Sequence, residues 1–232
     1  YSKKEISVQN DVDCLIITKN KLSYQTIKNK VLNLSAGIKL SDDVFKACLD
    51  NINFSFAYFC KKDFYEYVRK LMDGDILSVE PRSWAIGGKI HEIFLGDIKS
   101  AKIIFDKENN FTALQNLVKK QYPPKLKKTL LYYLKNEIDE KINLVERFLK
   151  QKNDFFFRLG VYEIAISIIR YIYAKNEIFL LPIKHISSGI CPEELLTKDR
   201  KMIEDIFKVL EIGKKDDMFL NLKKAVKLIK II

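Results

Sequence analysis

The spacing of apolar residues changes partway along this chain, and that change limits the possible folds more than any single residue does. Before about residue 110, short apolar runs of strand length alternate with amphipathic stretches; after it, every segment has helical spacing. Residues 155–176 are apolar on nearly every helical face, which is typical of a helix at the centre of a bundle. The pattern predicts an α+β protein, a small mixed sheet with flanking helices followed by an all-helical bundle.

The first part is predicted to alternate strands and helices. Residues 52–58 alternate apolar with small or polar side chains, and Ser41-Asp42-Asp43 offers an N-cap to a helix that begins at Val44. The expected elements are strands at 13–19, 52–58 and 101–106 and helices at 23–34, 44–49 and 62–72. A connector over 78–96, broken by Pro81 and two glycines, separates the last helix from the last strand.

The second part is predicted to contain only helices. Pro124 suits the first turn of a long helix, and Asn153 or Asp154 can cap the apolar helix that follows. The expected helices cover 111–120, 124–152, 155–176, 197–210 and 219–231. We therefore divide the chain into an α/β domain, 1–110, and a helical bundle, 111–232. Because the chain opens at Tyr1 without a Met, residues upstream can be missing from the first domain.

Basic residues are concentrated in the helical part. The chain has 41 Lys and Arg against 30 Asp and Glu, a net charge of +11. Residues 111–232 carry 24 basic and 15 acidic side chains, a net +9, whereas residues 1–110 carry 17 and 15, a net +2. Such a field favours anionic partners such as nucleotides or RNA. Lysines spread along amphipathic helices are also common on an ordinary solvated surface.

Composition excludes several classes of protein. With 47% hydrophobic and 31% charged residues, the chain is not disordered. Its four cysteines form no C-x-x-C pair and its two histidines have no ligand partner three or four residues away, which argues against a disulfide framework or a zinc site. The longest apolar run, 161–174, is too short to span a bilayer. We expect a cytoplasmic protein with no membrane partner, and the sequence leaves oligomerisation open.

An acidic pair stands at the start of the first predicted strand. Asp11-Val12-Asp13 runs directly into the apolar residues 14–18. Side chains two apart on a strand point to the same face, so the two carboxylates form a claw. Hard divalent cations take oxygen ligands, and Mg²⁺ is commonly bound by one or two carboxylates plus substrate phosphates. The pair predicts a metal and nucleotide site, or else a polar turn before a buried strand.

Three segments resemble the polymerase-β-like nucleotidyltransferase superfamily, most closely the kanamycin nucleotidyltransferase type with a C-terminal helical bundle. DVDCLII at 11–17 is similar to the Asp-x-Asp strand of that family. INFSF at 52–56, followed by KDF at 62–64, resembles its second core strand and the next helix. YIYAKNEIFLLPIKH at 171–185 is similar to a segment of its bundle. The family's Gly-Ser pair is not in this sequence, although Ser2 stands close to where it belongs.

The resemblance implies transfer of a nucleoside monophosphate from an NTP, with ATP the expected nucleotide, to the hydroxyl of a small acceptor or of RNA. It implies Mg²⁺ or Mn²⁺ held by Asp11 and Asp13. The family's third carboxylate falls on Asn53, whose neutral amide weakens metal binding, unless Asp50 takes that place. This departure leaves a second hypothesis open: a nucleotidyltransferase fold with weakened or lost chemistry that binds nucleotides or another protein.

The remaining site residues are expected from the helical part and the connector. The family's general base is a Glu of the bundle, for which Glu137 and Glu140 are candidates; a solvent-facing role is the alternative for each. Ser2, Arg82 and Lys184 are candidate nucleotide contacts, and a packing role is the alternative for Arg82 and Lys184.

Two further expectations concern the helical part. Glu163, within the apolar helix, is expected to pair with Arg170, two turns further along the same face. A purely basic RNA-binding role is less supported, because we identify no aromatic-interleaved basic motif in the sequence.

Overall fold

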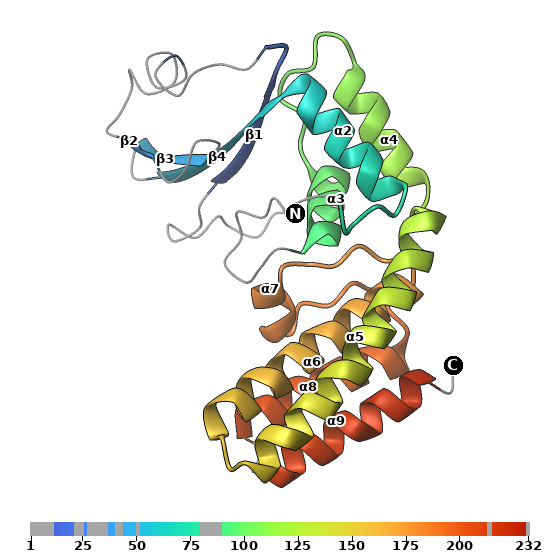
Figure 1. Ribbon diagram of the computed structural model, residues 1–232. Coiled ribbons are helices and arrows are strands. Elements are labelled where there is room, and N and C mark those ends of the chain that lie inside the picture. Colours follow the sequence, from blue (N-terminus) through green and yellow to red (C-terminus); the bar gives the residue numbers. More distant parts are fainter. Residues whose placement is uncertain are drawn as a thin grey trace. The chain divides into compact units, whose positions relative to one another are not determined.

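The computed structural model describes residues 12–20, 26, 37–39, 44–49, 52–78, 90–212 and 215–230. The chain divides into two compact units, Tyr1–Arg69 and Lys70–Ile232. The sequence pattern put the boundary near residue 110, which lies inside the second unit. Figure 1 shows a sheet in the first unit and helices throughout the second, so the protein is of the mixed α+β class.

The first unit contains a four-stranded mixed sheet. Its strands are β1 (Val12–Thr18), β2 (Gly37–Lys39), β3 (Val44–Leu49) and β4 (Ile52–Cys60), in the order β1-β4-β3-β2. β1 and β4 are parallel, whereas β3 is antiparallel to both β4 and β2. The strands expected at 13–19 and 52–58 are therefore confirmed.

The helix expected over 44–49 is wrong, because these residues form β3. The segment VFKACL has β-branched and aromatic residues, and it is only six residues long. It pairs in antiparallel register with β4, with Leu49 opposite Ile52. Ladder pairing across a short connection overrides the helix-capping signal of residues 41–43, which lie outside the described residues. The helix expected at 23–34 also lies outside the described residues, apart from Thr26.

Helix α2 (Lys61–Met72) follows β4 directly, as expected. Phe64, Tyr67, Val68 and Leu71, the apolar stripe identified in the sequence, are buried. Because these residues recur at helical spacing, one face of α2 supplies most of its apolar burial.

The connector and the strand expected at 101–106 both differ from the sequence prediction. Helix α3 (His91–Ser100) begins inside the connector. Residues 101–106 form no strand, and Ile104 and Phe105 are exposed. Gln115 of α4 (Asn110–Lys120) donates through Nε2 to the carbonyls of Ile98 and Ala101, at 3.0 and 2.7 Å. This capping of α3 binds the segment to a helix instead of to a neighbouring strand.

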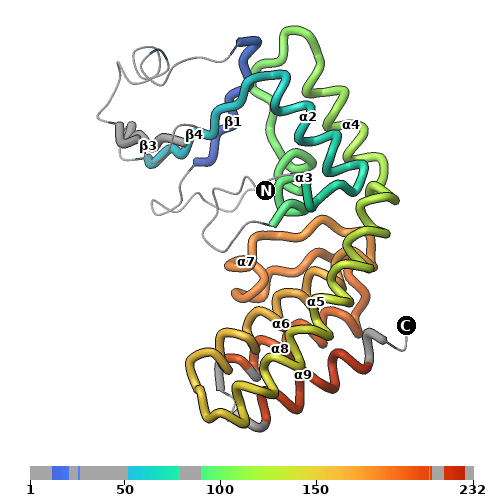
Figure 2. The backbone as a smooth tube through the Cα atoms, viewed as in Figure 1, coloured from blue at the N-terminus to red at the C-terminus, as the bar shows by residue number. Residues whose placement is uncertain are grey.

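The rest of the second unit is a helical bundle. Its helices are α5 (Pro124–Lys150), α6 (Asp154–Lys175), α7 (Ile183–Ser187), α8 (Thr197–Ile212) and α9 (Lys215–Lys230). Except for the short α7, each of them was expected from the sequence, as was α4. Figure 2 shows α5 and α6 running side by side as an antiparallel hairpin. None of the described helices is long and apolar enough to cross a membrane.

Helix α6 lies at the centre of the bundle, as its apolar sequence predicted. Its buried residues include Phe157, Val161, Ile164, Ile168 and Ile172. The side chain of Asn153 caps the helix by accepting from the backbone N–H of Phe156 at 3.4 Å, so the expected cap is confirmed. The core of the bundle therefore forms around this one helix.

Candidate functional site

Asp13 and Asn53 lie on the same face of the sheet. In the parallel pairing of β1 with β4, Asp13 stands opposite Ser55, and Asn53 precedes Ser55 by two residues on the same strand. Side chains two apart share a face, and paired residues of neighbouring strands point to the same side. Asp13 and Asn53 are exposed and Ser55 is buried. The register thus brings a carboxylate, an amide and a hydroxyl together at one end of two parallel strands.

Helix α2 packs near the other end of this face. Phe59, four residues after Ser55 and on the same side of β4, contacts Phe64 of α2 edge to face, with 5.6 Å between the ring centroids. The opposite face is largely aromatic: Phe54 and Phe56 stack at 5.9 Å, and the hydroxyls of Thr18 and Tyr58 are 2.7 Å apart. The polar residues therefore occupy the exposed end of the face that α2 shares.

The donor atoms on this face suit a hard cation. The carboxylate of Asp13, the amide oxygen of Asn53 and the hydroxyl of Ser55 are all oxygen donors, the type that Mg²⁺ prefers. Within the described ranges, no group of three or more His, Cys, Asp or Glu side chains could hold a metal. Asp11, the second residue of the expected claw, lies outside those ranges, as do Ser2, Asp50 and Arg82. The fit of this face to a metal ion therefore rests on the oxygen donors of Asp13, Asn53 and Ser55 and on the β1–β4 register that puts them on one face.

Glu137 and Glu140 differ in what surrounds them on α5. Glu137 accepts from the Ser167 hydroxyl at 2.9 Å through Oε2 and pairs with Lys141 at 3.0 Å through Oε1. Both carboxylate oxygens are engaged, and the side chain is only 18% exposed. Glu140 is exposed to solvent. Of the two candidate bases, Glu137 is thus held by contacts within the bundle, whereas Glu140 is accessible to solvent.

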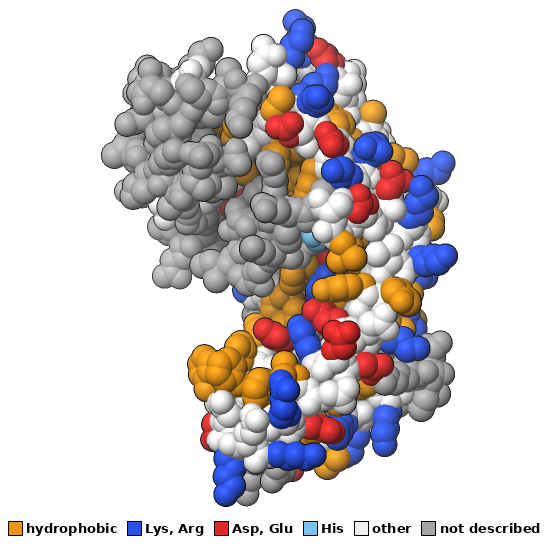
Figure 3. All heavy atoms as spheres, in the orientation of Figure 1, with side chains coloured by type: hydrophobic (Ala, Val, Ile, Leu, Met, Phe, Trp, Pro, Cys, Tyr) orange, Lys and Arg blue, Asp and Glu red, His pale blue; other side chains and the backbone are white. Residues whose placement is uncertain are grey.

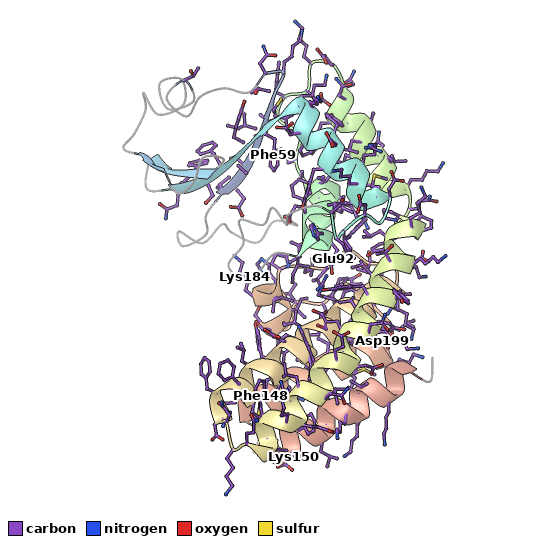
Figure 4. The ribbon with its side chains drawn as sticks, viewed as in Figure 1. Phe59, Glu92, Phe148, Lys150, Lys184 and Asp199 are labelled. Atoms are coloured by element: carbon purple, nitrogen blue, oxygen red, sulfur yellow. The ribbon has the colours of Figure 1, made fainter. Side chains whose placement is uncertain are left out.

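Lys184 is an exposed residue of α7, labelled in Figure 4. It is followed in sequence by His185, whose pKa is held below the usual value by partial burial and then by the Lys184 charge. A cation that is exposed to water and not neutralised by this neighbour can contact an anionic ligand.

Arg170 pairs with Glu92 of α3 and not with Glu163, so that expectation is wrong. Its Nε donates to Glu92 Oε1 at 2.6 Å and its Nη2 approaches Oε2 at 3.4 Å. Glu163 is 47% exposed and pairs with Lys141 at 3.3 Å. An exposed acid needs no buried partner, whereas Glu92, at 2% exposure, does. The signal in the sequence was an acid inside the apolar run 90–95.

The Glu92 carboxylate, labelled in Figure 4, affects the groups around it. Burial alone would lower the pKa of the Arg170 guanidinium, but the Glu92 charge and hydrogen bond outweigh burial and raise it. Burial, and then the Glu92 charge, also raise the pKa of Tyr122 well above its usual range. The hydroxyl of Tyr122 is buried and has no hydrogen-bond partner among the residues that the structure describes. These groups make a polar centre inside the second unit.

A shallow groove of about 400 Å³ lies at the start of α5. It is lined by Gln121, Tyr122, Pro124, Lys127, Lys128, Leu131 and Glu177. Lys127 is already paired with Glu177 at 2.6 Å. The groove therefore offers Lys128 as its remaining cation.

Comparisons with known proteins give one structural match. No protein-family model matches the chain, and no curated protein matches it in sequence. Among solved structures, a nucleotidyltransferase-like protein from Exiguobacterium sibiricum aligns with 92% of this chain at a TM-score of 0.45 and 10% sequence identity. The chain spans 61% of the length of that protein.

Proposed function

We propose that this chain is a nucleotidyltransferase, of the kanamycin nucleotidyltransferase type, that transfers a nucleoside monophosphate from an NTP to an acceptor hydroxyl. The observation that carries the proposal is the parallel register of β1 and β4, in which Asp13 and Asn53 lie on one sheet face with both side chains exposed. The Asp-x-Asp spacing of residues 11–13, at the start of the same strand, supports it. A small hydroxylated molecule and RNA are both acceptors of the right chemistry.

Asp11 and Asp13 are the proposed ligands of Mg²⁺ or Mn²⁺, with Asn53 in the third position. A bound divalent cation would neutralise phosphate charge and orient the phosphates for displacement of pyrophosphate. Asp13 supplies a full negative charge, whereas the Asn53 amide supplies only a dipole. Metal affinity in this arrangement depends chiefly on the aspartates and on the phosphates of the nucleotide.

Glu140 is the better candidate for the group that accepts the proton of the acceptor hydroxyl. A general base must reach the proton that it removes, so its carboxylate must be accessible to the acceptor. Glu140 is exposed, whereas both oxygens of Glu137 already accept from Lys141 and Ser167. Glu137 is better suited to holding α5 against α6.

Asn53 favours a second function, a nucleotidyltransferase fold that binds a nucleotide without transferring it. Replacement of a carboxylate by an amide removes a charge from the metal site, and transfer needs that charge more than binding does. The two functions share nucleotide binding and differ in the release of pyrophosphate.

The test is thermal unfolding in the presence of Mg²⁺ and each NTP. At about ten times the dissociation constant, binding adds about 1.4 kcal/mol and raises the melting temperature by about 3 to 5 °C. Asp11→Asn combined with Asp13→Asn should abolish that rise. Asp205→Asn, which removes an exposed carboxylate of α8, should retain it.

The results separate the two functions. A rise with one NTP, together with pyrophosphate release in the presence of small hydroxylated compounds or RNA, supports transfer. A rise with no pyrophosphate release from any acceptor supports the binding function. No rise with any NTP contradicts both.

A further inference from the structure

Exposed apolar side chains gather at the end of the α5–α6 hairpin. Phe155 is 71% exposed and Phe156, Leu159 and Tyr162 are each more than 40% exposed. Phe155, Leu159 and Tyr162 lie at positions i, i+4 and i+7 of α6, which share one helical face. Figure 3 shows hydrophobic side chains gathered at this end of the bundle. Together with Phe148 of α5, these four residues are called the hairpin patch.

The aromatic rings of the hairpin patch pack against one another. Phe148 and Phe156 stack with their centroids 5.4 Å apart and their planes at 27°. Phe155 meets Phe156 edge to face at 5.3 Å. The guanidinium of Arg147 lies 5.9 Å from the centroid of Phe148. The three phenylalanine rings thus form one contiguous aromatic cluster, beside which Leu159 and Tyr162 extend the exposed apolar stripe of α6, and exposed apolar patches commonly mark interaction sites.

The border of the hairpin patch is basic. Arg147, Lys150, Lys152 and Arg158 are all exposed, and they outnumber the two acids that adjoin the patch in sequence, Asp154 and Glu163. Lys150 and Lys152 belong to the end of α5 and the turn that follows it, next to Phe148 and Phe155 in sequence. An interaction surface with an apolar centre and a cationic border fits a partner of the opposite arrangement.

We propose that the hairpin patch is a docking surface for an acidic amphipathic helix of another protein. The stripe at i, i+4 and i+7 is a helical ridge about 10 Å long, the geometry that packs into the groove of a second helix. Leucine or aromatic anchors of that helix cover Phe155, Leu159 and Tyr162. Its flanking Asp and Glu side chains face the lysines and arginines of the border.

Three other occupants fit these observations less well. A second copy of this chain would bring the same four cations to the interface, which like-charge repulsion opposes. Nucleic acid bases need open ring faces, but Phe148 and Phe156 stack on each other. A bilayer would have to take up the carboxylates of Asp154 and Glu163, which adjoin the patch in sequence and are costly to bury in lipid.

The test uses a fluorescently labelled synthetic helix with leucines at i, i+4, i+7 and i+11 and glutamates at most other positions, titrated with the full chain. Fluorescence anisotropy should show saturable binding that weakens as salt is raised. Phe155→Ala combined with Leu159→Ala should weaken binding at least about tenfold. Tyr132→Ala combined with Leu220→Ala removes exposed apolar side chains outside the patch and should leave binding unchanged. Lys150→Glu combined with Lys152→Glu should weaken binding at low salt.

Several outcomes overturn the proposal. Equal binding to the wild type and to the Phe155 and Leu159 variant means that the patch is not the docking surface. Binding of a helix with lysines in place of glutamates removes the charge argument. A dimer in light scattering that the same variant converts to a monomer assigns the patch to a second copy. Patch-dependent binding of anionic vesicles or of oligouridine, without binding of the acidic helix, assigns it to lipid or nucleic acid.

Discussion

Glu92 and Arg170 form a pair that is almost wholly removed from water. Their side chains are 2% and 13% exposed. Two charges in such a place attract strongly, but each has lost its hydration, so the net stabilisation by the pair is small. Removing one partner costs much more stability, because the other charge is left buried without compensation.

Glu92→Gln should therefore destabilise the second unit strongly. We expect a loss of about 3 to 5 kcal/mol in the free energy of unfolding, measured by urea denaturation followed by circular dichroism. Asp205→Asn, which breaks the exposed pair with Lys201, should cost about 1 kcal/mol or less. Replacing both Glu92 and Arg170 by Leu and Met should recover part of the loss; a double variant no more stable than Glu92→Gln contradicts this explanation.

His91, next to Glu92, predicts a dependence of stability on pH. Burial lowers the pKa of its imidazole in the folded protein; the Glu92 charge raises it, the Arg170 charge lowers it and a hydrogen bond to the Ile76 backbone raises it, so that the net shift is downward. In the unfolded chain the pKa is about 6.5. As the pH falls below about 6.5, the unfolded chain takes up a proton before the folded protein does, so stability should fall.

The measurement is the melting temperature between about pH 7.5 and pH 5, above the range in which most carboxylates titrate. His91→Gln should flatten the decline more than His185→Gln does, since His185 is less buried. An unchanged slope in His91→Gln would show that His91 does not control it.

At the scale of elements, the close contact of α5 and α6 depends on one glycine. A Cβ built on Gly160 would lie 2.5 Å from Cγ2 of Val145. In an isolated helix, Gly→Ala is favourable by about 1 kcal/mol, but the clash here is with a fully buried side chain in a packed core. The distance between α5 and α6 at this contact therefore determines where the other side chains of the hairpin lie.

Gly160→Ala should therefore destabilise the bundle, by about 1 to 3 kcal/mol in urea denaturation. Val145→Ala removes the methyl group that clashes, so the double variant should be more stable than the sum of the two single effects predicts. Strict additivity of the two substitutions would mean that Gly160 and Val145 do not make this contact.

The sequence predicted the helices of the bundle better than the other elements, for a physical reason. Helices α5 and α6 carry their apolar period and their start signals in the local sequence. β3 looked helical because its capping residues are local, whereas its pairing with β4 depends on another strand. Residues 101–106 looked like a strand because most of them are apolar, but helix α4 holds both ends of the segment: Gln115 donates to the carbonyl of Ala101, and Thr112 donates to the carboxylate of Asp106.

The candidate site shows the same difference between local and distant information. The Asp-x-Asp pattern and the place of Asn53 on the next core strand could be read from the sequence, and the β1–β4 register puts Asp13 and Asn53 on one face. The pairing of Arg170 with Glu92 could not be read from the sequence, because 78 residues separate the two. Of the two partners of Glu137, Lys141 stands one turn away and could be expected from the sequence, whereas Ser167, 30 residues away, could not.

At the scale of the whole molecule, the two units carry different functional features. The first unit carries the sheet face with Asp13 and Asn53, and the second carries most of the net positive charge and the hairpin patch. We propose that the sheet face with Asp13 and Asn53 binds a divalent cation together with a nucleotide. Its key residues are Asp13 and Asn53, whose substitution changes the charge of that face in opposite directions.

Binding of Mn²⁺, observed by electron paramagnetic resonance in the presence of an NTP, tests that claim most directly. We expect one ion per chain, at least about tenfold weaker binding in Asp13→Asn, and tighter binding in Asn53→Asp, which adds a carboxylate on the same face. Equal Mn²⁺ affinity in the wild type, Asp13→Asn and Asn53→Asp would contradict the account.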